Sequence, residues 1–220
     1  MKYEEGGLPA MWGTCPFCGT YASEPPICEN AHGDQELWCS VCGRSRSFKP
    51  QPLFLITGAS GVGKTSLSAR LFYGQTNYLV MENDILWSAA FDTPEDDYRT
   101  LRETWLRLAS NIGQGGKPVV LCGCATPQQY NNCINRRYIS KMYYLALYCD
   151  DEVLENRLRI GRSVHDEGWI QSSLAFNRWI RDSADKTDPP MTRLDTTSLT
   201  IEQAAERAEQ WIGANLRMRK

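Results

Sequence analysis

Short apolar runs alternate with helical patterns through most of the chain from residue 53 onward. Five runs have the length of a buried strand, at residues 53–57, 78–81, 118–122, 143–148 and 192–195. Between them, residues 98–112 and 201–212 keep the three-and-four spacing of apolar side chains that is typical of a helix buried on one face. This alternation predicts an α/β fold with a five-stranded parallel sheet and helices on both of its faces.

The first 50 residues follow a different pattern, since they are rich in Cys, Gly and Pro and lack an extended apolar period. A segment this small needs a staple such as a metal ion to fold. Pro50 and Pro52, in the stretch 48–52, disfavour both helix and central strand. We therefore expect a linker here and two domains, at residues 1–50 and 51–220.

The cysteines of the first segment form two C-x-x-C-G units, Cys15 with Cys18 and Cys39 with Cys42. Twenty residues separate the two units, which lies within the usual spacing for zinc held by four thiolates. The arrangement resembles a zinc ribbon, in which Zn²⁺ substitutes for a missing apolar core. Cys28 and His32 lie between the units and are expected to be bystanders, because two complete pairs already satisfy a tetrahedral ion.

The overall composition and net charge exclude few classes of protein. The formal net charge of −2 gives no overall attraction to nucleic acid or to acidic membranes, so any such contact would need a local basic patch. The chain shows no signal-like or membrane-spanning apolar run, and its clustered cysteines suit a metal site in a reducing compartment. The expected location is the cytoplasm, without a membrane partner.

A complete phosphate-binding loop, G-x-x-x-x-G-K-[ST], occupies Gly58 to Thr65 between a predicted strand and a predicted helix. Its glycines let consecutive backbone N–H groups turn toward one anion, and Lys64 supplies a charge to the β and γ phosphates. The Thr65 hydroxyl is expected to bind Mg²⁺. The residues expected to hold the nucleotide are Gly58, Ser60, Gly61, Val62, Gly63, Lys64, Thr65 and Ser66.

A carboxylate follows the second predicted strand rather than the third. The strand at 118–122 continues into Cys122-Gly123-Cys124 without an acidic residue, which disfavours a nucleotide-dependent switch. Asp84, across the crevice from the phosphate loop, suits a general base for an acceptor hydroxyl. Two alternatives stay open: Asp84 caps a helix that begins at Ile85, or Glu82 shares the catalytic role.

Arginines gather after the fourth predicted strand, at positions 157, 159 and 162. On a closing segment, such side chains stabilise the charge of a transferred phosphoryl group and exclude water. The alternative is that they favour the negative end of a helix and stay solvated. Four further arginines could bind an anionic acceptor, but each is expected to be solvated at the surface: Arg99, Arg102, Arg136 and Arg137.

With these motifs in place, residues 53–213 resemble the small nucleoside, nucleotide and metabolite kinases, a group that includes adenylate, shikimate and gluconate kinases and chloramphenicol phosphotransferase. The stretch from Arg157 to His165 is similar to the lid entry of adenylate kinases. The resemblance implies that Arg157 lies against adenine, that Arg162 touches phosphate, and that ATP and Mg²⁺ are bound on a five-stranded parallel sheet.

The sequence therefore predicts a kinase that transfers the γ-phosphoryl group of ATP to a small molecule, with a nucleoside or nucleotide as the favoured acceptor. Lys64, Asp84 and Arg162 are the expected catalytic residues. One alternative is a polynucleotide 5′-hydroxyl kinase, in which basic and aromatic residues near the ribbon contact nucleic acid. Another is a nucleic-acid-binding ATPase or switch module. The acceptor, the choice between ATP and GTP, and the role of the ribbon stay open at this stage.

Overall fold

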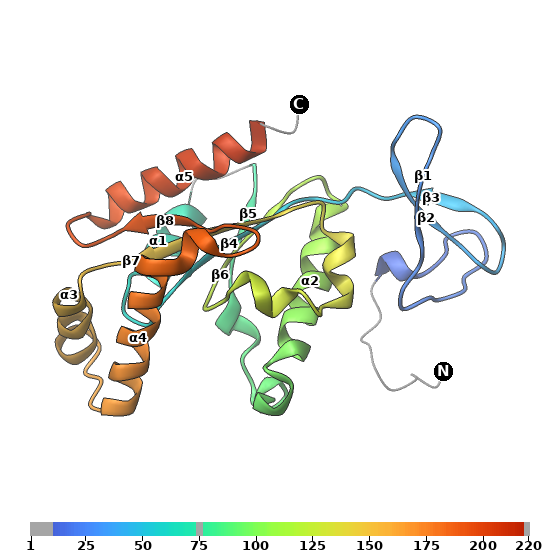
Figure 1. Cartoon of the computed structure of the whole chain (residues 1–220). Helices are drawn as coiled ribbons and strands as arrows, with labels where there is room; N and C mark the ends of the chain where they lie inside the picture. The colour runs from blue at the N-terminus through green and yellow to red at the C-terminus, as the bar shows by residue number, and fades with distance from the viewer. Residues whose placement is uncertain (1–10, 74–76, 218–220) are drawn as a thin grey trace.

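The computed structural model describes residues 11–73 and 77–217 and contains two sheets (Figure 1). The smaller sheet is antiparallel and belongs to the cysteine-rich ribbon, with β1 (Ile27–Glu29), β2 (Gln35–Trp38) and β3 (Ser45–Ser47). The larger sheet is parallel and has the order β5-β6-β4-β7-β8. Its strands are β4 (Leu53–Gly58), β5 (Leu79–Glu82), β6 (Val119–Cys122), β7 (Met142–Tyr148) and β8 (Thr192–Asp195). The prediction of a five-stranded parallel sheet is confirmed.

Five α-helices flank the parallel sheet: α1 (Lys64–Phe72), α2 (Arg99–Gly113), α3 (Asp151–Asn156), α4 (Glu167–Ser183) and α5 (Ile201–Arg217). Helices α2 and α5 were expected from their spacing, and α4 was not. Its signals were present in the sequence, since Ile170 and Leu174 are buried four residues apart and the Asp166 carboxylate accepts a hydrogen bond from the Trp169 N–H at 2.9 Å. Within the described part of the chain, no helix is long and apolar enough to cross a membrane.

The central strand β4 shows why the parallel sheet could be predicted from the sequence. All six of its residues are buried, and alternate side chains enter two different apolar clusters. Phe54 and Ile56 pack with residues of α1 and α5, whereas Leu53 and Leu55 pack with residues of α2. A strand covered on both faces has to be apolar throughout, which is the pattern that its sequence shows.

Short 3₁₀ helices fill the connections on either side of β6. Three of them, Asn83–Leu86, Ala89–Phe91 and Pro94–Asp96, lie between β5 and α2, and two more, Pro127–Tyr130 and Ile134–Tyr138, lie between β6 and β7. A π turn over Arg157–Gly161 continues α3. Apart from the helix considered at Ile85 as an alternative, the 3₁₀ helices were not predicted, because three to five residues are too few to carry a helical period.

The ribbon packs at the amino end of the parallel strands, where the chain enters β4, and lies at the opposite end of the molecule from α3 (Figure 1). Tyr138, from the connection before β7, is fully buried in the apolar cluster of the ribbon together with Trp12, Leu37 and Phe48. Its hydroxyl donates to the Pro25 carbonyl at 3.0 Å. The ribbon is therefore fixed to the sheet domain by a shared core.

Candidate functional site

The phosphate loop closes the carboxyl end of β4, as predicted. Gly58 has a φ of 156°, and a Cβ there would stand 2.8 Å from the Leu147 carbonyl oxygen. Gly61 has a φ of 81° and would meet the Leu158 side chain at 3.0 Å. Both positions therefore require glycine, because the loop is wedged between β7 and the turn after α3.

Lys64 begins α1 and folds back over the loop. Its ammonium donates to the carbonyl oxygens of Gly58 at 2.7 Å and Ala59 at 2.9 Å. Gly63 precedes it as the cap residue of α1, in a left-handed conformation and without a side-chain hydrogen bond. The first N–H groups of the helix consequently face the mouth of the loop, where they and the helix dipole favour an anion.

A pocket of about 480 Å³ opens beside this loop. Its lining includes every expected nucleotide-binding residue from Gly61 to Ser66, together with Arg157, Arg162 and the stretch from Leu199 to Ile201. Thr196 closes the far side, where its hydroxyl and carbonyl accept hydrogen bonds from the Arg157 guanidinium at 3.4 and 3.0 Å. The pocket combines a cationic phosphate end with a partly apolar end, which fits a nucleoside triphosphate.

The three arginines after β7 have different partners. Arg162 donates to the Ser60 hydroxyl of the phosphate loop at 2.9 Å, so its guanidinium lies at the phosphate end of the pocket. Arg159 points elsewhere and forms ion pairs with Glu155 at 2.8 Å and Glu167 at 2.6 Å. The structure thus brings Arg157 and Arg162 to the pocket and engages Arg159 between two carboxylates.

Two carboxylates stand at the end of β5. Glu82 accepts a hydrogen bond from the Ser68 hydroxyl at 3.2 Å, and with Thr65 it lines a second, smaller pocket of about 280 Å³. Asp84 is exposed, and its side chain makes no hydrogen bond or ion pair with a described residue. The capping alternative for Asp84 is wrong, because the 3₁₀ helix begins at Asn83 and Glu82 holds the cap position without a side-chain bond.

The segment after β6 lies between these carboxylates and the phosphate loop. Thr57, fully buried, donates its hydroxyl proton to the Ala125 carbonyl at 2.7 Å and accepts from the Ala125 N–H at 2.9 Å. The Cys124 thiol donates to the Gly58 carbonyl at 3.2 Å. Burial raises the pKa of Cys122 to about 12, so this thiol stays protonated and is not a nucleophile. No motif in the sequence pointed to these contacts.

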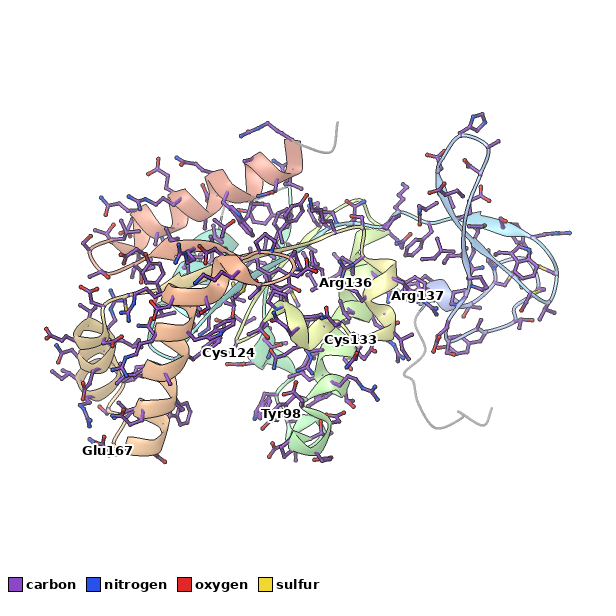
Figure 2. The ribbon with its side chains drawn as sticks, in the orientation of Figure 1. Tyr98, Cys124, Cys133, Arg136, Arg137 and Glu167 are labelled. Atoms are coloured by element: carbon purple, nitrogen blue, oxygen red, sulfur yellow. The ribbon has the colours of Figure 1, made fainter. Side chains whose placement is uncertain are left out.

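The arginines suggested for an anionic acceptor are mostly committed elsewhere. Arg102 is buried and pairs with Asp97 at 3.2 Å, which corrects the expectation of a solvated side chain. Arg136 donates to the Ile139 carbonyl at 3.2 Å. Arg137 pairs with Glu24 of the ribbon at 2.9 Å, and both it and Arg136 lie toward the ribbon, away from Cys124 and Tyr98 (Figure 2). Arg99 is exposed at the start of α2.

The four cysteines of the ribbon form a cluster that fits zinc. The sulfur atoms of Cys15, Cys18, Cys39 and Cys42 all lie within 4.8 Å of one another, and two of the distances between them are 3.7 Å. A tetrahedral ion with Zn–S bonds of about 2.3 Å would place its sulfurs about 3.8 Å apart. Cys28 and His32 do not join this cluster, in agreement with the bystander prediction.

Each half of the cluster is a tight turn with matching backbone bonds. The Gly19 N–H donates to the Cys15 carbonyl and the Gly43 N–H to the Cys39 carbonyl, both at 2.9 Å. Both glycines have positive φ, at 74° and 70°, which explains the glycine after each pair. Hydrogen bonds from the Thr20 hydroxyl and N–H lower the pKa of Cys18 to about 6.

Comparison with known proteins shows relationship at the level of fold. No family model and no curated protein matches this sequence. Among solved structures, a sugar kinase from Janibacter sp. HTCC2649 is similar, with a TM-score of 0.56 and 20% identity over 74% of this chain and 95% of that one. A gluconokinase from Sinorhizobium meliloti 1021 gives 0.52 and 18% over 80% and 99% of the two chains.

A tunicamycin resistance protein from Deinococcus radiodurans is similar to the same degree, with a TM-score of 0.52 and 20% identity over 74% of this chain and 96% of that one. Identities this low carry no information on the substrate. They agree with the strand order, the phosphate loop and the helices on both faces of the sheet. This chain therefore has the fold of the P-loop kinases, joined at its amino-terminal side to a ribbon with a four-cysteine cluster.

Proposed function

We propose that this protein is an ATP-dependent kinase that transfers the γ-phosphoryl group to a hydroxyl group of a small molecule. The observation that carries the proposal is the convergence on one pocket of Lys64, of the start of α1 and of Arg162, which is bonded to Ser60 of the loop. Phosphoryl transfer depends mainly on positioning and on stabilising negative charge, and these groups supply both.

Each residue at the phosphate loop has a separate role in the proposed reaction. Lys64 and the N–H groups of the loop hold the β and γ phosphates, Arg157 lies beside the base, and Arg162 neutralises the transferred group. The Thr65 hydroxyl would bind Mg²⁺, whose charge offsets that of the phosphates. Glu82 lines a pocket together with Thr65 and accepts from Ser68, so it suits the water shell of the metal.

Asp84 is the proposed general base. It is exposed at the end of β5, two residues beyond Glu82, and no described residue engages its carboxylate. A carboxylate free of other partners can accept the proton of an incoming hydroxyl group. Glu82, in contrast, already accepts a hydrogen bond, which is why we assign the two carboxylates different roles.

The acceptor is proposed to be uncharged, as a nucleoside is, rather than a nucleotide. A phosphate or carboxylate on the acceptor would need a cation near Asp84. Arg102 is neutralised by Asp97, Arg136 and Arg137 lie toward the ribbon, and residues 83–98 contain acidic side chains but no Lys or Arg. Of these four arginines, Arg99 and Arg137 are exposed, and Arg137 pairs with Glu24 of the ribbon.

The ribbon does not support a polynucleotide acceptor. It packs at the amino end of β4, and a strand of six residues at about 3.3 Å per residue separates it from the phosphate loop by about 20 Å. Residues 11–50 carry three basic and four acidic side chains, and the Arg46 guanidinium donates a hydrogen bond to the Trp12 carbonyl at 2.6 Å. We propose that the ribbon supports the sheet domain.

The test is a transfer assay with γ-labelled ATP and a panel of nucleosides, nucleoside monophosphates, sugars, hydroxylated amines and 5′-hydroxyl oligonucleotides. We expect label on an uncharged hydroxyl compound. Asp84→Asn should lower kcat by about 10²- to 10⁴-fold, as loss of a general base does, with little change in ATP affinity. Label that appears only as inorganic phosphate would refute the kinase proposal, and efficient labelling of a monophosphate would refute the uncharged acceptor.

A further inference from the structure

The three residues after β6, Gly123-Cys124-Ala125, contact the donor side of the crevice. The Gly123 N–H donates to the Ile56 carbonyl at 3.1 Å, which continues the pairing of β6 with β4. Cys124 and Ala125 bond to Gly58 and Thr57 respectively. This short segment is thereby fixed to the strand that ends in the phosphate loop.

The same segment touches the turn that carries the two carboxylates. A Cβ built on Gly123 would stand 2.5 Å from the Cβ of Asn83, 3.1 Å from its Cγ and 3.6 Å from its Nδ2. All three atoms belong to one side chain, the one between Glu82 and Asp84 in the sequence. Gly123 is not among the positive-φ glycines of the described chain. Glycine is therefore needed here for space and not for its backbone freedom.

Trp105 of α2 holds the other side of this turn. Its indole Nε1–H donates to the Asn83 carbonyl at 3.2 Å, and only 1% of the surface of Trp105 is exposed. Asn83 is thus held between the end of β6 and a rigid aromatic side chain. A buried indole N–H needs an acceptor, so the bond strongly restrains the Asn83 backbone.

We propose that Gly123 and Trp105 are positioning residues that fix the distance of Glu82 and Asp84 from the phosphate loop by clamping Asn83 between them. The inference rests on the proposed kinase function, because the positions of Glu82 and Asp84 matter for turnover only if these carboxylates take part in phosphoryl transfer. In-line transfer requires the base, the acceptor and the γ phosphate in one geometry, and a misplacement of about 1 Å can cost on the order of 10²-fold in rate.

The size of the perturbation follows from the contact. An ordinary van der Waals contact for a Cβ lies at 3.4–4 Å, so a methyl group at position 123 would push the Asn83 Cβ from 2.5 Å to that range. The shift has to be taken up by the turn, since Gly123 is bonded to β4 on its other side. Glu82 and Asp84 would move with the turn.

The test is a double-mutant cycle of Gly123→Ala and Asn83→Gly, with Gly213→Ala as the matched control. The added methyl group at Gly213, in α5, meets only the Arg217 guanidinium at 3.7 Å. We measure kcat, the KM for ATP, and amide hydrogen exchange over residues 79–87. Gly123→Ala should lower kcat by about 10- to 100-fold, leave the KM for ATP nearly unchanged and speed exchange in the turn. In the Asn83→Gly background the added methyl group should change kcat by less than about threefold.

Three outcomes would overturn the inference: a normal kcat in Gly123→Ala, an equal loss of kcat in both backgrounds, or a loss of kcat without a change in exchange. If the unmodified protein transfers no label to any acceptor, the proposed function fails instead, and exchange in the two backgrounds still decides whether Asn83 needs the space. Should Gly123→Ala fail to fold, Trp105→Phe removes the Nε1–H from the other side and should give the same split between kcat and KM.

Discussion

The clearest structural prediction concerns Tyr138, through which the sheet domain enters the core of the ribbon. Its ring centroid lies 4.2 Å from that of Trp12 and 5.8 Å from that of Phe48, and the side chain is fully buried. Tyr138→Ala would empty this space. Truncation of a large buried aromatic side chain costs about 3–5 kcal/mol of folding free energy.

Tyr138→Phe separates the ring from the hydroxyl group. It keeps the packing but removes the donor to the Pro25 carbonyl, and leaving a buried acceptor unpaired costs about 1–3 kcal/mol. Arg137 also loses an acceptor, since it donates to the same hydroxyl at 3.1 Å. The expected order of stability is therefore unmodified protein, then Tyr138→Phe, then Tyr138→Ala.

The assay is urea unfolding followed by circular dichroism, combined with the zinc content of the folded protein. Tyr73→Ala is the matched control, because that tyrosine is 79% exposed and its loss should change stability by less than about 0.5 kcal/mol. Zinc should stay bound in Tyr138→Ala, because all four sulfurs belong to the ribbon. If Tyr138→Ala were no less stable than Tyr73→Ala, the shared core would not hold the two parts together.

Four further predictions follow from individual contacts. Lys64→Ala should abolish phosphoryl transfer while leaving the melting curve almost unchanged, because the ammonium lies on the loop and not in the core; transfer at a normal rate would exclude the loop as the donor site. Arg162→Ala should lower kcat on the order of 10²-fold, whereas Arg159→Ala, which loses only exposed ion pairs, should have little effect on kcat; equal losses would contradict the assignment. Elemental analysis should find one Zn²⁺ per chain, lost on acidification and in Cys39→Ser, and zinc-free purified protein would refute the site. Burial raises the pKa of Cys122 from 9.0 to about 12, so between these pH values the folded state keeps a proton that the unfolded chain releases. The free energy of unfolding should therefore fall as pH rises from 9.0 to about 12, and it should fall less steeply in Cys122→Ala.

Features with a strong local cause were predictable from the sequence. The central strand β4 is apolar because it is covered on both faces, and the phosphate loop needs its glycines where Gly58 and Gly61 meet neighbouring atoms. The same holds for the cysteine pairs, whose glycines adopt positive φ. In each case one physical requirement acts on a few consecutive residues, so it leaves a readable pattern.

Features that depend on tertiary contact were not predictable. Arg102 was expected to be solvated, since most arginines are. The tertiary fold instead buries it and pairs it with Asp97. The hypothesis that Asp84 caps a helix assumed a start at Ile85, but the chain turns two residues earlier into a 3₁₀ helix. Tyr138 gives no sign in the sequence that it belongs to the core of a segment 90 residues before it.

The position of the ribbon limits how it can act on catalysis. None of its described residues lines the pocket beside the phosphate loop, and it packs at the opposite end of β4. Tyr138 joins it to the 3₁₀ helix Ile134–Tyr138, whose first N–H groups donate to Glu103 of α2. Helix α2 in turn holds Asn83 through Trp105. One route from the ribbon to the carboxylates therefore runs through α2, and an effect of zinc on turnover by this route would arise from the stability of this helix and not from contact with the substrate.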